Sequence, residues 1–181
     1  YSNLTIDFTR TYHNIASNTN TTAFVKGRLA HVFLDYTYRD LSVEANRRLF
    51  IDADLKPAEN QVSLSPIIYL PLTDADTAGT NLGTGGDFTI NGTLDTAQRG
   101  PNQWNCVASE FDGVADYLNR SSEMTGVVDS KEITCSFVFD LNNVNSNSNY
   151  IFSSSTGGVM RVSVRLEEIQ STNTMDLRVL V

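Results

Sequence analysis

The sequence predicts an all-β protein, an antiparallel sandwich with one short helix near residues 42–51. Runs of alternating apolar and polar residues recur along the chain, and polar or glycine-rich stretches separate them. One of these runs, residues 29–34, is apolar on both faces, which is typical of a strand inside a sandwich. Only one stretch has helical spacing. Together these patterns favour two packed sheets.

The first 35 residues predict two strands separated by a loop. Apolar residues alternate from Leu4 to Phe8, so residues 1–12 are expected to form a half-exposed strand. Residues 13–22 are polar and turn-forming, and we expect a loop there. The strand inside the sandwich follows within residues 23–35.

Residues 40–52 are the helix candidate. Asp40 or Ser42 can cap its N-terminus, and Glu44 lies in the first turn, where the helix dipole favours a carboxylate. Pro57 excludes a continuation of the helix, because proline lacks the amide hydrogen and clashes with the preceding turn.

The pair Asp112-Gly113 predicts a tight turn, because glycine adopts positive φ at no steric cost and aspartate tolerates it. Residues that favour β-structure lie on both sides of the pair, so residues 107–118 are expected to form a two-stranded hairpin. A third strand is predicted at residues 133–139, with alternate apolar side chains on one face.

Four further strands are predicted, at residues 88–90, 150–155, 159–168 and 176–181. In the third of these runs one face is apolar and the other is charged, as expected of an outer strand of a sandwich. The glycine-rich run 83–86 lacks the Lys-Ser/Thr ending of a phosphate-binding loop, so it predicts a turn.

The chain is acidic, with a formal net charge of −8 among 181 residues. A nucleic-acid-binding surface needs clustered lysine and arginine, so we expect no nucleic-acid partner. No apolar run approaches 18 residues, so the sequence predicts no membrane-spanning helix. The chain begins at Tyr1 without methionine and ends on an apolar, strand-like run, which leads us to expect a piece of a longer chain.

Two stretches of the sequence are similar to a known family. The runs SEFDGVADYL and EITCSFVF, within residues 104–155, resemble the opening of laminin-G-like, concanavalin A-like jelly-roll domains. Residues 26–94, which include VEANRRLFIDADLKP and NLGTGGDFTINGTL, resemble the closing segment of such domains in structural proteins of tailed phages, together with the stretch directly after that segment. The resemblance implies a jelly-roll sandwich of the concanavalin A-like kind.

The two stretches occur in the reverse of the family's order, and two arrangements explain this. Residues 1–95 are interpreted as the C-terminal half of one sandwich and residues 96–181 as the N-terminal half of a second. The linker would lie near residues 95–105, where Gly100-Pro101 breaks regular structure. Alternatively, residues 1–181 form one sandwich with a permuted strand order. Tandem domains are commoner in phage fibres, which favours the first arrangement.

The resemblance implies a non-enzymatic structural component of a virion or fibre, such as a tail fibre, a head fibre or a decoration protein, in the virion or outside the cell. Its partners would be other copies of the chain or other virion subunits. The alternative is a glycan-binding adhesin, or lectin, that recognises a host surface. A glycoside hydrolase is least favoured, because the sequence has no strand motif that would aim two carboxylates into one cleft.

The adhesin alternative directs attention to aromatic residues, because sugar sites commonly stack an aromatic ring on the sugar face. The candidates are Trp104, Tyr36 and Tyr38. For Trp104, a place in the core or at a sheet edge is the favoured interpretation.

Lectin-like sandwiches often hold Ca²⁺ through loop carboxylates and carbonyls. The candidates here are Asp74 and Asp76, together with Asp87 or Asp112. The loop that carries the first two lacks the spacing of an EF-hand, so a solvated acidic loop is the favoured interpretation.

Cys106 and Cys135 are the only cysteines, and both fall on predicted strands. A disulfide requires that these strands be neighbours, and two separate buried thiols are the favoured interpretation. The two histidines show no sequence feature of a catalytic or metal site. His13 is predicted to face solvent in a loop, and His31 to be packed within its strand.

Overall fold

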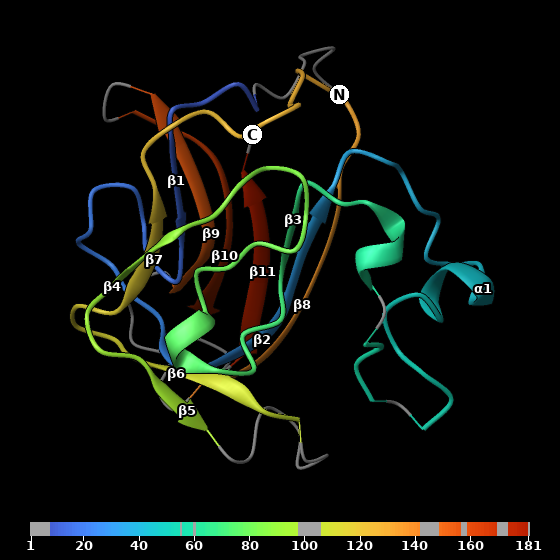
Figure 1. Cartoon of the computed structure of the whole chain (residues 1–181), viewed down its shortest axis with the longest axis horizontal. Helices are drawn as coiled ribbons and strands as arrows, with labels where there is room; N and C mark the ends of the chain where they lie inside the picture. The colour runs from blue at the N-terminus through green and yellow to red at the C-terminus, as the bar shows by residue number, and fades with distance from the viewer. Residues whose placement is uncertain are drawn as a thin grey trace.

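A computed structural model describes residues 8–54, 56–59, 61–97, 106–141, 149–156, 159–169 and 174–180. Within these residues the chain forms two antiparallel β-sheets, so the predicted all-β sandwich is confirmed (Figure 1). Helical structure in this part of the chain is limited to α1 (Glu44–Arg47) and to the 3₁₀ turns Gln61–Leu64 and Ala75–Thr77. No helix among the described residues is long and apolar enough to cross a membrane.

One sheet has six strands in the spatial order β11, β10, β9, β1, β7, β4. Their bounds are Thr174–Leu180 (β11), Val159–Ile169 (β10), Asn149–Thr156 (β9), Tyr12–Ile15 (β1), Tyr117–Arg120 (β7) and Thr89–Asn91 (β4). The short strand β1 therefore lies in the interior of this sheet, between β9 and β7.

The other sheet is organised around β2 (Lys26–Asp35), which confirms the strand predicted inside the sandwich. β8 (Thr134–Leu141) pairs with one edge of β2. Two strands share the opposite edge: β6 (Ala108–Asp112) pairs with residues 26–29, and β3 (Ile68–Leu70) pairs with residues 32–34. β5 (Asp95–Ala97) extends this sheet beyond β6.

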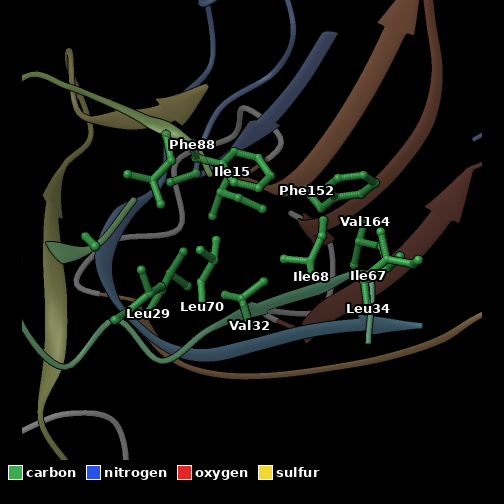
Figure 2. Close-up of a cluster of buried hydrophobic side chains, with 14 of the residues drawn as sticks. Ile15, Leu29, Val32, Leu34, Ile67, Ile68, Leu70, Phe88, Phe152 and Val164 are labelled. Atoms are coloured by element: carbon green, nitrogen blue, oxygen red, sulfur yellow. The ribbon is translucent and has the colours of Figure 1, made fainter. Parts of the chain in front are cut away.

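The main core lies between the two sheets (Figure 2). β2 and β3 contribute Leu29, Val32, Leu34, Ile68 and Leu70, and the six-stranded sheet contributes Ile15, Leu118, Phe152 and Val164. None of these side chains is more than 3% exposed. Because full burial of a side chain of this size stabilises the fold by about 1.5–3 kcal/mol, the contact between the sheets dominates stability.

The predicted loop over residues 13–22 is wrong at its start, because β1 occupies Tyr12–Ile15. His13 and Asn14 are polar but fully buried, which also corrects the prediction that His13 faces solvent. The Asn14 side chain donates from Nδ2 to the Ser17 Oγ at 3.0 Å and accepts at Oδ1 from Asn119 Nδ2 at 2.8 Å. Hydrogen bonds of this kind allow polar side chains inside a sheet. The predicted strand residues 1–7 lie outside the described part of the chain.

The predicted hairpin over residues 107–118 is not a hairpin. β6 belongs to the five-stranded sheet and pairs with β2 and β5, whereas β7 belongs to the six-stranded sheet and pairs with β1 and β4. Asp112 and Gly113 instead begin a corner that leads the chain from one sheet to the other, and Gly113 has a φ of 77° there. The Asp112 Oδ1 accepts hydrogen bonds from the backbone N–H groups of residues 114–116 at 2.7, 2.9 and 3.1 Å.

The helix is much shorter than the predicted range of about 42–51. α1 spans Glu44–Arg47, its N-cap is Val43 without a side-chain cap, and none of its residues is buried. A helix without a buried apolar face gains no packing energy from further turns, which accounts for its length. Phe50 lies beyond the helix and packs edge-on against Phe33 of β2, with ring centroids 5.1 Å apart.

Both sheets mix strands from before and after residue 95. β1 lies between β7 and β9, and β2 lies between β8 on one edge and β6 and β3 on the other. The described residues thus share one core. The position of a boundary near residue 95 within a longer chain, and the jelly-roll connectivity, stay predictions.

Candidate functional site

A break in the five-stranded sheet creates the candidate site. β6 pairs with β2 only as far as Leu29, and β3 begins to pair at Val32, so Ala30 and His31 face a gap on that edge. The register between β2 and β8 also shifts between Ala30 and Phe33. His31 has a φ of 50°, in the left-handed region that residues with side chains seldom adopt. Bulges of this kind re-aim a side chain, and they are common next to functional sites.

The gap opens on a pocket of about 360 Å³. Two buried polar side chains, His31 and Tyr69, line it. The apolar part of its wall consists of Pro57, Val62, Pro71, Leu82 and Val107. The exposed polar residues of its lining are Lys56, Glu59 and Thr73. Such a combination of apolar walls with a few convergent polar groups is typical of ligand pockets.

Hydrogen bonds fix the orientation of the polar groups in the pocket. The His31 Nδ1 lies 3.1 Å from the Tyr69 hydroxyl, which donates in turn to the backbone carbonyl of Glu59 at 3.3 Å. When the single hydroxyl proton is directed to that carbonyl, Nδ1–H is the donor toward Tyr69 and Nε2 keeps its lone pair. The backbone N–H of His31 donates separately to the backbone carbonyl of Pro71 at 3.0 Å.

The surroundings keep these groups uncharged at neutral pH. Burial lowers the pKa of His31, against the opposing influence of the Glu59 carboxylate. Burial raises the pKa of Tyr69, and Glu59 raises it further. Burial also raises the pKa of the Cys106 thiol, which lines the same pocket. The described polar groups can therefore offer hydrogen bonds, whereas a thiolate nucleophile is disfavoured.

Three of the four candidate Ca²⁺ ligands, Asp74, Asp87 and Asp112, use their carboxylates in local backbone hydrogen bonds. Asp74 accepts from the N–H of Asp76 at 3.0 Å, Asp87 accepts from Asn81 N–H at 2.9 Å, and Asp112 holds the corner between the sheets. Across the described ranges, no three His, Cys, Asp or Glu side chains gather as a metal site would require.

The aromatic residues predicted to bind a glycan do not form a joint platform. The half-buried Tyr36 packs against Phe8, with ring centroids 4.5 Å apart. Burial raises the pKa of the Tyr36 hydroxyl, and the nearby Asp129 carboxylate raises it further. Tyr38 is 63% exposed. Trp104 lies outside the described residues.

Cys106 and Cys135 are both free thiols in the structure. Cys106 lies two residues before β6 and not on a strand as predicted, whereas Cys135 lies in β8 and packs against the main core. β6 and β8 flank opposite edges of β2, so the two cysteines are not on neighbouring strands.

Sequence reasoning missed the pocket residues His31, Glu59 and Tyr69. The one signal in the sequence is a histidine in a strand that is otherwise apolar on both faces. That pattern predicts a packed residue, and His31 is indeed only 7% exposed. The bulge that gives it access to a pocket depends on where β3 and β6 end, which local patterns do not encode.

Comparison of the chain with protein-family models, with curated proteins and with solved structures returns no match. The likeness of two sequence stretches to laminin-G-like phage domains therefore stays a prediction.

Proposed function

We propose that the chain is a non-enzymatic structural module of a virion or extracellular fibre, and that it contacts further copies of itself. The β-sandwich and the resemblance of residues 26–94 and 104–155 to laminin-G-like phage domains support this proposal. The observation that carries it is an exposed apolar surface on residues 38–51, here called the α1 segment.

Exposed apolar side chains concentrate on the α1 segment. Among the described residues, nine large hydrophobic side chains are exposed, and four of them lie in this one stretch. They are Tyr38 (63%), Leu41 (45%), Val43 (47%) and Ile51 (45%). The segment projects from one side of the sandwich in Figure 1. Contiguous exposed apolar patches mark protein contact surfaces, which makes this stretch the candidate contact.

Hydrogen bonds hold the α1 segment in a defined shape. The Asn46 side chain donates to the Asp40 carbonyl at 2.9 Å, and the Arg47 guanidinium donates to the carbonyls of Leu41 and Ser42 at 2.8 and 2.7 Å. A surface that is already ordered loses less conformational entropy on association. The segment is therefore suited to a repeated contact between subunits.

The test measures self-association of the 181-residue chain by analytical ultracentrifugation. We expect species heavier than the 20.0 kDa monomer, and we expect the double variant Leu41→Ser/Val43→Ser to weaken association by about tenfold or more, because apolar area leaves the contact. Added salt should strengthen association, because copies with a net charge of −8 repel one another.

Val114→Ser/Val128→Ser is the matched control, because these residues are 71% and 63% exposed and lie outside the α1 segment. This variant should associate like the unmodified chain. Circular dichroism checks that all variants are folded. A chain that stays monomeric at concentrations on the order of 100 μM would overturn the proposal.

Glycan binding is the second candidate function, and the exposure of Tyr38 favours it. A solvent-facing phenol ring can stack on a sugar face. Binding to immobilised glycans tests this function: loss of binding in Tyr38→Ala but not in Leu41→Ser/Val43→Ser indicates the adhesin, and absence of glycan binding by the unmodified chain excludes it.

A further inference from the structure

We propose that the pocket beside His31 binds a compact, mainly apolar molecule of one or two rings that carries a single hydrogen-bond donor. The site is separate from the proposed contact between subunits, which involves the exposed face of the α1 segment. Three observations lead to this ligand class: the strained position of His31, the polarity of the pocket's hydrogen-bonding groups, and the chemistry of its walls.

Two of the five described non-glycine residues with positive φ lie at positions that shape the pocket. His31 has a φ of 50°, and Leu72, between the lining residues Pro71 and Thr73, has a φ of 57°. The His31 N–H to Pro71 carbonyl bond joins these two bends. Left-handed backbone at a non-glycine residue is strained and persists where the surrounding structure enforces it, which is frequent at ligand sites.

The buried polar groups of the pocket offer an acceptor. The chain of hydrogen bonds from His31 through Tyr69 to the Glu59 carbonyl uses Nδ1–H and the tyrosine hydroxyl proton. In this tautomer Nε2 keeps its lone pair, and no described residue makes a hydrogen bond to it. A ligand that donates one hydrogen bond to Nε2 fits this arrangement, whereas a ligand with an acceptor at that place does not.

The size and walls of the pocket set the body of the ligand. A cavity of about 150 Å³ lined by apolar side chains takes benzene, so about 360 Å³ holds one or two rings. Two wall residues, Val62 and Leu82, are 41% and 47% exposed, so a bound ring would cover apolar surface that now faces water. That burial supplies the main part of the binding energy, and the bond to Nε2 supplies selectivity.

The test titrates the chain with indole and with 1-methylindole, two molecules of similar shape of which only the first has an N–H donor. Binding is followed by ¹H–¹⁵N NMR of backbone amides. We expect indole to shift the amides of Thr73, Cys106 and Val107, and to bind about tenfold more tightly than 1-methylindole, which is the effect of one hydrogen bond. Equal binding of both molecules, or no shift of these amides at millimolar indole, would overturn the proposal.

Three variants test where and how indole binds. Leu82→Asp places a charge in the exposed wall and should weaken indole binding about tenfold or more, while Val114→Asp, at a residue that is not part of the pocket, should leave it unchanged. Tyr69→Phe removes the group that fixes the His31 tautomer and should reduce the preference for indole over its methylated form. Unchanged indole affinity in Leu82→Asp would place the binding elsewhere and contradict the proposal. None of these readouts depends on self-association.

Discussion

Asn81 joins the glycine-rich loop to β3 through all the hydrogen-bonding capacity of its side chain. Its Oδ1 accepts from the backbone N–H groups of Tyr69 and Gly83 at 2.8 and 3.0 Å, and its Nδ2 donates to the carbonyls of Ile67 and Gly86 at 3.0 and 3.1 Å. This amide therefore links the loop to Tyr69, the middle member of the His31–Tyr69–Glu59 hydrogen-bond chain, and the Tyr69 carbonyl also accepts from Leu82 N–H at 2.9 Å. At residue scale, polar groups position this fold as much as apolar ones do.

His13 makes stability depend on pH. The pKa of His13 is lowered to about 4, chiefly by burial, which the hydrogen bond to the Arg10 carbonyl opposes and the charge of Arg120 assists. Above pH 6.5 the imidazole is neutral in both the folded and the unfolded chain, so the full stability is present. Between pH 6.5 and about 4 the unfolded chain binds the proton first, and the free energy of unfolding falls by roughly 3 kcal/mol from this residue.

Urea denaturation across this pH range measures the effect. His13→Gln removes the titrating ring, so its free energy of unfolding should change less between about pH 7 and about pH 4 than that of the unmodified chain. His31 is retained in both proteins, so its own titration cancels in the comparison. Parallel curves for the two proteins would show that His13 does not contribute.

At the scale of elements, the corner between β6 and β7 is the feature on which both sheets depend. Asp116 is 3% exposed, accepts from Thr93 N–H at 2.8 Å with one carboxylate oxygen, and accepts from Asp112 N–H at 3.0 Å with the other. The corner thus fixes the path between the sheets through two carboxylates rather than through a strand pair.

Asp116→Ala should lower the free energy of unfolding by about 2–4 kcal/mol, because two inward-facing backbone N–H groups lose their acceptors. Asp116→Asn keeps one acceptor oxygen and should show an intermediate loss. Asp95→Ala, at an exposed position of β5, is the control and should stay within about 0.5 kcal/mol. Urea titration measures all three. A loss in Asp116→Ala no larger than in the control would refute this role for the corner.

The same corner explains what the sequence could and could not predict. β2, β8 and β10 follow from the sequence, because β2 is apolar on both faces and β8 and β10 alternate over eight residues or more. The position of the turn at Asp112-Gly113 is predicted correctly, but the backbone conformation of a turn does not reveal whether the flanking strands pair or separate into two sheets. β1 escapes prediction because His13 and Asn14 are polar, and only distant partners such as Asn119 make their burial favourable.

The candidate pocket was unpredictable for a related reason. It requires that β3 and β6 stop short of each other along one edge of β2, and each strand end is set by packing against segments far away in the sequence. A histidine in an apolar strand gives no indication of such a break. Its left-handed conformation becomes evident only when the sheet is assembled.

At the scale of the whole molecule, the strands before and after residue 95 depend on one another. Without β6–β11, β1 loses both of its neighbours and β2 keeps only β3. A fragment of residues 1–97 should therefore remain unfolded, with poorly dispersed amide signals in NMR spectra, while the 181-residue chain gives dispersed signals. A folded fragment would contradict the shared core and would favour an independent unit ending near residue 95.

The hydrogen bond from the Ser153 Oγ to the Ser17 carbonyl spans 136 residues of sequence, and that from Asn119 to Asn14 spans 105. β1 contains Asn14 and ends just before Ser17, and it lies inside its sheet between β9 and β7. The six-stranded sheet is therefore complete only after segments more than 100 residues apart in sequence have come together. Loop-closure entropy opposes such contacts, and proteins dominated by them fold on the millisecond-to-second scale. During synthesis β2 must wait for β6 and β8 to emerge. Until they emerge, the apolar faces of β2 are exposed. Newly made chains therefore avoid association with one another only if synthesis of the last strands is completed first.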